Sequence, residues 1–222
     1  ISSHHGTIDK FEGDAIIAFW GAPLKLPNHA TVACYATLEM QQRSVELRKM
    51  LLEQNRPLLY TRMGLNSGPV VVGNMGSAER MDYTMMGDVV NLAARLEGAN
   101  KFYKTYSMIS GSTYELTKED VDSRQLDIIR VVGKKEPVPV HELLARKNET
   151  SSEMSGVVEQ YLKGLKLYQD KNFADAVKEF EKVLTIDPED GPSLTYVKRC
   201  GVFIETPPEK DWDGVFTFTE KG

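Results

Sequence analysis

An asparagine and an arginine four residues apart, Asn91 and Arg95, are the side chains that could bind a phosphate group. They lie in the stretch Arg80–Gly98, where we expect a helix that begins at Asp88, because an Asp side chain can accept the unpaired amide N–H groups of a first turn. Residues four apart share one helix face, and a guanidinium group near a helix N-terminus suits phosphate. Alone, the pattern also fits an ordinary surface helix with a solvated arginine.

Two turns carry further charged groups that could take part in chemistry. Residues 7–23 are typical of two short strands joined at Glu12-Gly13-Asp14, and the tight turn at Gly13 places the Asp14 carboxylate at the start of the second strand. The same residues are also ordinary hairpin-turn chemistry with no further role. Lys134, in the turn 133–137, is either a solvated lysine or a phosphate contact.

The elements that would position these side chains alternate between strands and helices. Several neighbouring strands are joined by turns that are typical of hairpins, and this pattern predicts an α+β fold rather than a doubly wound one. Residues 58–74 in particular predict a strand, a turn and a second strand that pair as a hairpin. The other expected elements are helices at 28–54, 88–98 and from Ser112 or Thr113, and strands at 106–110, 126–132 and 138–143.

The chain changes character after residue 146. Residues 147–155 are polar and predict a linker, residues 156–205 predict a helical hairpin with a capping helix, and residues 206–222 predict an extended tail. The helical segment resembles one tetratricopeptide unit, which cannot bury its own apolar face and therefore needs a neighbour. The residues at the corresponding offsets are Gly164, Ala176, Phe180 and Pro188.

Composition excludes some classes of protein. The net charge of −5 argues against a nucleic-acid-binding protein. Cys34 and Cys200 lie far apart and match neither a zinc motif nor a disulfide framework, which favours a reducing compartment. The longest apolar runs are strand-sized and no signal peptide is visible, so we expect this segment to be cytoplasmic. The abrupt start of the chain suggests that it is part of a longer protein.

Two stretches resemble the catalytic domain of class III nucleotide cyclases. GTIDKFEGDAIIAFWGAP (6–23) is similar to the family's second-metal hairpin, and LNSGPVVVGNMGSAERMDYTMMGDVVNLAARLEG (65–98) is similar to its most characteristic stretch. The resemblance covers roughly residues 1–145, and its motifs occur in the family's order. It implies a ferredoxin-like cyclase catalytic domain over 1–146, followed by a small all-α segment.

The resemblance also implies roles for the residues that bind the sugar and the phosphates. Asn91 matches the residue that orients the ribose, and Arg95 matches the residue that stabilises charge on the phosphates. Lys134 falls where the family places a triphosphate-binding lysine.

Purine recognition and metal binding are implied in the same way. Lys10 matches the purine-reading position where lysine goes with adenine and glutamate with guanine, and Thr84 matches the second purine-reading position, which is threonine in many bacterial cyclases. Asp14 matches a carboxylate that binds the catalytic metal pair, two Mg²⁺ or Mn²⁺ ions. The implied reaction converts ATP to 3′,5′-cyclic AMP and pyrophosphate, by in-line attack of the 3′-oxygen on the α-phosphorus.

Each site of the family lies between two protomers, so the resemblance implies a homodimer in which Lys10 and Asp14 serve opposite sites. The family's first strand, with the other metal aspartate, is not found in these 222 residues. We therefore expect the chain alone to be inactive or weak. We also expect an upstream sensor or membrane domain in the parent, a bacterial signalling protein.

Three alternatives stay open. Guanylate cyclase is disfavoured by Lys10, because a lysine cannot accept hydrogen bonds from the N–H groups of guanine. A catalytically dead, regulatory dimerisation module is disfavoured because Lys10, Asp14, Asn91 and Arg95 are all in place. In the third alternative the helical segment is itself an interaction module.

Overall fold

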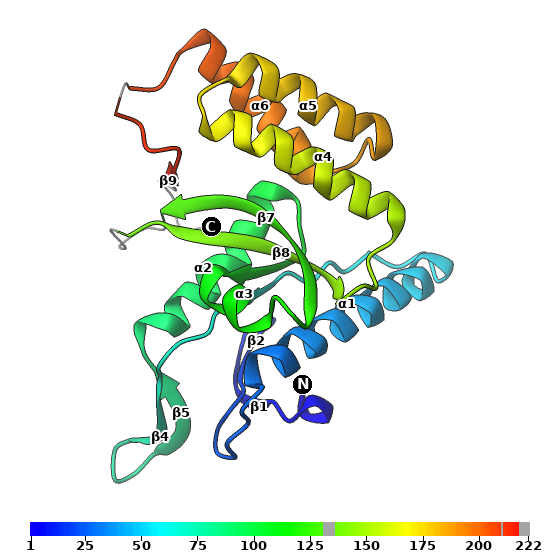
Figure 1. Ribbon diagram of the computed structural model, residues 1–222. Coiled ribbons are helices and arrows are strands. Elements are labelled where there is room, and N and C mark those ends of the chain that lie inside the picture. Colours follow the sequence, from blue (N-terminus) through cyan, green and yellow to red (C-terminus); the bar gives the residue numbers. More distant parts are fainter. Residues whose placement is uncertain (131–135, 210, 218–222) are drawn as a thin grey trace.

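The computed structural model describes residues 1–130, 136–209 and 211–217. The predicted α+β class is confirmed: a five-stranded sheet has helices on both faces, and two small hairpins project from one end (Figure 1). Lys134 lies outside the described residues. The helices are α1 (His29–Glu53), α2 (Asp88–Tyr103), α3 (Gly111–Thr117), α4 (Ser152–Gln169), α5 (Phe173–Ile186) and α6 (Gly191–Glu205), after a short 3₁₀ turn at Ser2–His4.

The five-stranded sheet has the order β3-β6-β8-β7-β9, and β1 with β2 and β4 with β5 form separate antiparallel pairs. In the large sheet β3 runs parallel to β6 and β9 runs parallel to β7, while β8 is antiparallel to both of its neighbours. The strands are β1 (Thr7–Glu12), β2 (Ala15–Phe19), β3 (Met63–Leu65), β4 (Val71–Gly76), β5 (Met81–Met86), β6 (Ser107–Ser110), β7 (Val121–Arg130), β8 (Val138–Arg146) and β9 (Phe216–Thr217).

The hairpin predicted over 58–74 is wrong. β3 pairs with β6, and β4 pairs instead with β5 across the turn that follows Gly76. The turn after β3 cannot close a hairpin because its polar groups bind other elements. The Asn66 amide donates to the carbonyl of Val89 in α2 (2.9 Å) and its Oδ1 accepts from Ser112 in α3 (3.1 Å).

Two apolar clusters lie on opposite faces of the sheet. In β6 Met108 belongs to one cluster and Ile109 to the other, as the alternation of strand side chains requires. One cluster packs against α1 and α3, and the other packs against α2 and α4–α6. The helix that carries Asn91 and Arg95 therefore shares its face of the sheet with the C-terminal helices.

The C-terminal helices pack on the chain's own sheet, as Figure 1 shows. α4 begins at Ser152, inside the range 147–155 predicted as a linker, because the Ser151 hydroxyl caps it by accepting from the Met154 amide (3.1 Å). The tail returns along the sheet edge, where Phe216 pairs with Ile129. The likeness to a tetratricopeptide unit stays a prediction. Among the described residues, no helix is both long and apolar enough to cross a membrane.

Candidate active site

Helix α2 presents Asn91 and Arg95 away from the core. Leu92 and Leu96 are buried beneath it, whereas Asn91 is exposed and Arg95 is half-buried. The structure shows no hydrogen bond or ion pair from either side chain to any described residue, so both can bind a ligand. The predicted cap is off by one residue: Gly87 occupies the N-cap position without a side-chain hydrogen bond, and Asp88 lies in the first turn.

Close contact with β3 holds α2 in place. A Cβ atom on Gly64 would lie 2.3 Å from the carbonyl oxygen of Ala93 and 2.3 Å from the amide nitrogen of Glu97, so only a glycine permits this approach. The Asn100 side chain is fully buried, and its amide donates to Met63 in β3 and to Leu96 in α2, both at 3.0 Å. These contacts place the helix that carries Arg95 against the sheet.

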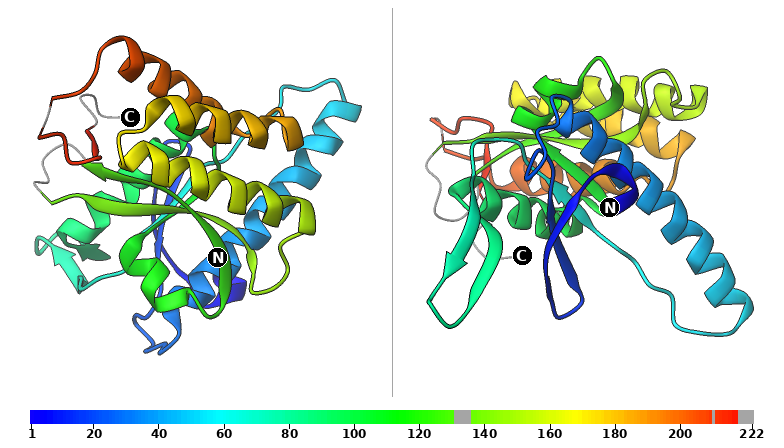
Figure 2. Two further views of the ribbon diagram at one scale, coloured as in Figure 1. Left: turned by 45° about the horizontal axis from the view of Figure 1, so that its top comes forward. Right: turned by 90° about the horizontal axis from the view of Figure 1, so that it is seen from below.

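The two hairpins carry the predicted purine-reading residues. Lys10 lies on β1, where its ammonium group is 3.4 Å from the Asp9 carboxylate and its side chain is partly exposed. Thr84 lies on β5, and its buried hydroxyl has no hydrogen-bond partner among the described residues. The hairpins lie side by side, since the rings of Phe19 and Tyr83 are 6.3 Å apart (Figure 2).

Asp14 lies in the two-residue turn between β1 and β2, directly before β2. Gly13 has a φ of 62°, which a glycine adopts without strain, and the Asp14 side chain is exposed. Within the described ranges no three His, Cys, Asp or Glu side chains come together where they could hold a metal ion. The described residues around Asp14 therefore do not form a site for a divalent ion by themselves.

Comparison with known proteins supports the resemblance. Residues 2–144 match the family model of the adenylate and guanylate cyclase catalytic domain. The chain belongs to this family. Adenylate cyclase 1 of Rhizobium meliloti is 36% identical over 144 residues, which is 65% of this chain and 22% of that protein.

Two further similar proteins extend this result. The terminal-differentiation-specific adenylate cyclase of Dictyostelium discoideum is 33% identical over 212 residues, which is 93% of this chain and 10% of that protein, so the similarity reaches the C-terminal helices. The chain thus spans a quarter or less of both curated relatives. The crystal structure of the adenylyl cyclase CyaB from P. aeruginosa has a TM-score of 0.60 at 33% identity, covering 68% of this chain and 77% of that one.

Two hollows among the described residues are lined by residues other than the predicted site residues. A cavity of about 150 Å³ lies between β2, the start of α1 and the first turn of α2, with Trp20, His29 and Val89 in its wall. A second hollow, of about 580 Å³, lies between α1 and β8. Neither is lined by Lys10, Asp14 or any residue of the Asn91 and Arg95 face.

Sequence reasoning missed the residues that position the cyclase helix α2. Gly64 and Asn100 touch no predicted ligand, and their types alone do not indicate which backbone they approach. A glycine within a strand does suggest that another backbone comes close, and this was the signal available for Gly64.

Proposed function

We propose that this chain is the catalytic domain of an adenylate cyclase, which converts ATP to 3′,5′-cyclic AMP and pyrophosphate. The observation that carries the proposal is the pair Asn91 and Arg95, one turn apart on the outer face of α2 and without a hydrogen bond or ion pair to any residue that the structure describes. The names of both curated relatives agree with it.

The side chains suit the reaction. The planar guanidinium of Arg95 would stabilise the negative charge that spreads over the phosphates while the 3′-oxygen bonds to the α-phosphorus and pyrophosphate leaves. The Asn91 amide would hold the ribose so that the 3′-oxygen lies in line with the leaving group. Lys134 would bind the triphosphate.

Adenine would be read by Lys10 and Thr84. The Lys10 ammonium can donate a hydrogen bond to a ring nitrogen of adenine. The Thr84 hydroxyl, buried without a partner among the described residues, could bind the purine from β5. Mg²⁺ or Mn²⁺, when bound, would neutralise the phosphates, with Asp14 as one ligand. A single carboxylate binds a pair of divalent metal ions weakly, so we propose that these 222 residues alone are inactive or weakly active.

We further propose that the active unit is a homodimer with two shared sites. Neither of the two hollows described above is lined by the site residues, and both hairpins expose large apolar side chains that a second copy could cover. The exposed fractions are 68% for Phe11, 52% for Ile16, 68% for Val71, 61% for Met81 and 62% for Met86. An upstream sensor or membrane domain in the parent protein belongs to the same proposal.

Two other functions remain candidates. The family includes guanylate cyclases. Competition between ATP and GTP distinguishes an adenylate cyclase from a guanylate cyclase, because a chain that prefers GTP would contradict the role of Lys10. A catalytically dead dimerisation or regulatory module would form neither cyclic nucleotide.

The proposal is tested by the affinity of the purified chain for a fluorescent ATP analogue, with Arg95→Ala compared with Lys101→Ala. Both substitutions remove one positive charge from α2, but Lys101 lies in the last turn, far along the helix from Asn91. Loss of a charge-assisted hydrogen bond to phosphate costs about 1.5–3 kcal/mol, so Arg95→Ala should weaken binding about 10- to 100-fold. Lys101→Ala should leave it unchanged.

Equal affinities of the two variants would contradict the role of Arg95. Formation of cyclic AMP from Mn-ATP by the unaltered chain is measured in parallel. A slow or undetectable rate is expected, and a rapid one would refute the proposal that the chain is weak alone.

A further inference from the structure

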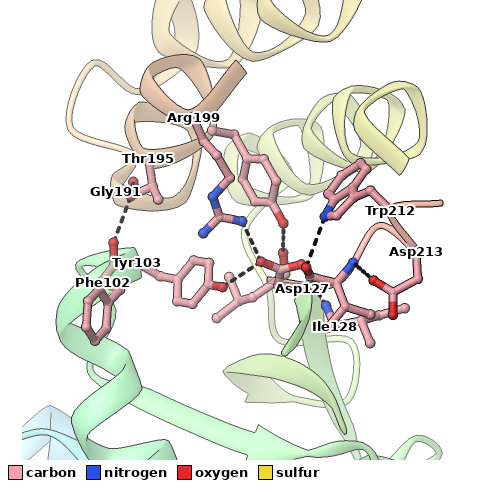
Figure 3. A network of polar contacts seen from close by, with 12 residues as sticks. Phe102, Tyr103, Asp127, Ile128, Gly191, Thr195, Arg199, Trp212 and Asp213 are labelled. Carbon is pink, nitrogen blue, oxygen red and sulfur yellow. Dashed lines mark hydrogen bonds and ion pairs between the residues drawn. The ribbon is translucent and has the colours of Figure 1, made fainter. Parts of the chain in front are cut away.

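A buried carboxylate joins the catalytic helix to the C-terminal helices. Asp127 of β7 is 1% exposed, and its Oδ2 accepts hydrogen bonds from the Tyr103 hydroxyl of α2 and from the Arg199 guanidinium of α6, both at 2.6 Å (Figure 3). Its Oδ1 accepts from the amide of Ile128 at 2.7 Å. The charge of Asp127 is therefore paired and fully hydrogen-bonded, as a buried carboxylate requires.

A β-bulge aims the neighbouring backbone at the same helices. Leu126 has no partner on β8, because Gln125 pairs with His141 and Asp127 pairs with Val140. The Leu126 carbonyl instead accepts two buried hydroxyls, from Tyr161 of α4 (2.9 Å) and Tyr196 of α6 (3.0 Å). The bulge thus supplies a docking point for α4 and α6 that does not involve α2.

The start of α6 also meets the end of α2 directly. The Thr195 hydroxyl donates to the carbonyl of Phe102 at 2.9 Å, one of the terminal carbonyls that a helix cannot pair within itself (Figure 3). A Cβ atom on Gly191 would lie 2.5 Å from the Tyr103 carbonyl oxygen, so the two backbones are in contact. The same end of α6 is fixed to the sheet by the buried ion pair of its N-cap residue Asp190 with Arg124 of β7 (2.7 Å).

We propose that the C-terminal helices set the position of α2, and that Tyr103 and Arg199 are positioning residues which act through Asp127. Tyr103 lies eight residues after Arg95, about 12 Å along a rigid helix. A displacement of the Tyr103 end therefore moves the end that carries Asn91 and Arg95. The proposal depends on the proposed function in one respect only, namely that Asn91 and Arg95 bind ATP.

The test compares two substitutions that each delete one buried hydroxyl from the same core. Tyr103→Phe removes the hydrogen bond between α2 and Asp127, which keeps Arg199 and the Ile128 amide. Tyr161→Phe is the control, because the Leu126 carbonyl keeps Tyr196 and no contact of α2 is lost. Three quantities are measured on the whole chain: the midpoint of thermal unfolding, the rate of hydrogen exchange of the α2 amides without nucleotide, and the affinity for the fluorescent ATP analogue.

Both variants should lose some stability, but only Tyr103→Phe should speed exchange along α2 and weaken ATP binding, by about threefold or more. Arg199→Gln should act in the same direction, and Arg199→Lys should recover part of the effect because it keeps a cation beside Asp127. Equal exchange of α2 and equal ATP affinity in the two tyrosine variants would overturn the proposal, whether or not Arg199→Gln folds. Failure of the unaltered chain to bind ATP would refute the proposed function, while the exchange measurement would still decide the coupling.

Discussion

Replacing Gly64 by alanine should shift α2 away from β3 and weaken nucleotide binding. The added Cβ would lie 2.3 Å from the Ala93 oxygen and 2.3 Å from the Glu97 nitrogen, whereas ordinary contact begins at 3.4 Å. The difference, 3.4 − 2.3, means that helix and strand must separate by about 1 Å. The clashing atoms are backbone, so no rotation of a side chain relieves the contact.

The magnitude follows from two effects. Overpacking of this size costs about 1–3 kcal/mol of stability, which corresponds to a fall of roughly 2–4 °C in the unfolding midpoint for each kcal/mol in a chain of this length. A displacement of about 1 Å in a catalytic group can lower activity up to about 100-fold. Since Arg95 lies between the two residues that clash, we expect ATP to bind about tenfold more weakly to Gly64→Ala.

The assay measures the unfolding midpoint and the affinity for a fluorescent ATP analogue in Gly64→Ala and in Gly156→Ala. Gly156 lies within α4 and an added Cβ would meet no atom within 4 Å, so this control should be neutral or gain up to about 1 kcal/mol. An unchanged midpoint in Gly64→Ala would refute the tight packing of α2 on β3. A lower midpoint with unchanged affinity would refute the link between that packing and the nucleotide site.

Two further predictions concern specificity and pH. Lys10→Glu should weaken ATP binding about tenfold and improve binding of GTP, because a carboxylate accepts hydrogen bonds from guanine and cannot donate to adenine. Competition between the two nucleotides for the variant measures this change. An unchanged preference for ATP over GTP would contradict the role of Lys10. Burial lowers the pKa of His141 from 6.5 to about 4 in the folded chain. As the pH falls through this range, His141 therefore becomes protonated in the unfolded chain before it does so in the folded chain. The stability that His141 contributes is therefore complete above pH 6.5 and about 3 kcal/mol is lost by pH 4. Urea unfolding measures the free energy of unfolding of the unaltered chain and of His141→Gln at both pH values. The difference between the two chains should change by this amount between pH 6.5 and pH 4, and a difference that does not depend on pH would refute the role of His141.

Local elements could be predicted because their signals lie in neighbouring residues. The Gly13 turn predicted β1 and β2, and the apolar spacing predicted α1 to within a residue at each end. The start of α2 at Asp88 was also predicted, but the helix runs five residues past the predicted end at Gly98, to Tyr103. The pairing of β3 could not be predicted in this way. Its partner β6 lies beyond α2 in the chain, and the turn after β3 is held by long-range contacts of Asn66.

The C-terminal helices show the same division. Their apolar faces predicted that a neighbour must cover them, but periodicity alone did not identify that neighbour. The buried contacts of Asp127 with Arg199 and of Arg124 with Asp190 identify that neighbour as the chain's own sheet. Such pairs join residues 66 to 72 positions apart, which no local pattern records.

The sequence by itself determined which chemical groups this cyclase domain presents: the Asn91 and Arg95 pair, the Asp14 turn and Lys10, each specified by residue type and short spacing. Only the tertiary structure decided how α2 is held, by Gly64 against β3 on one side and by Tyr103 and Asp127 beneath α6 on the other. The physical reason is that side-chain chemistry and turn geometry are local properties. Close packing and burial of charge depend instead on which distant backbones come into contact.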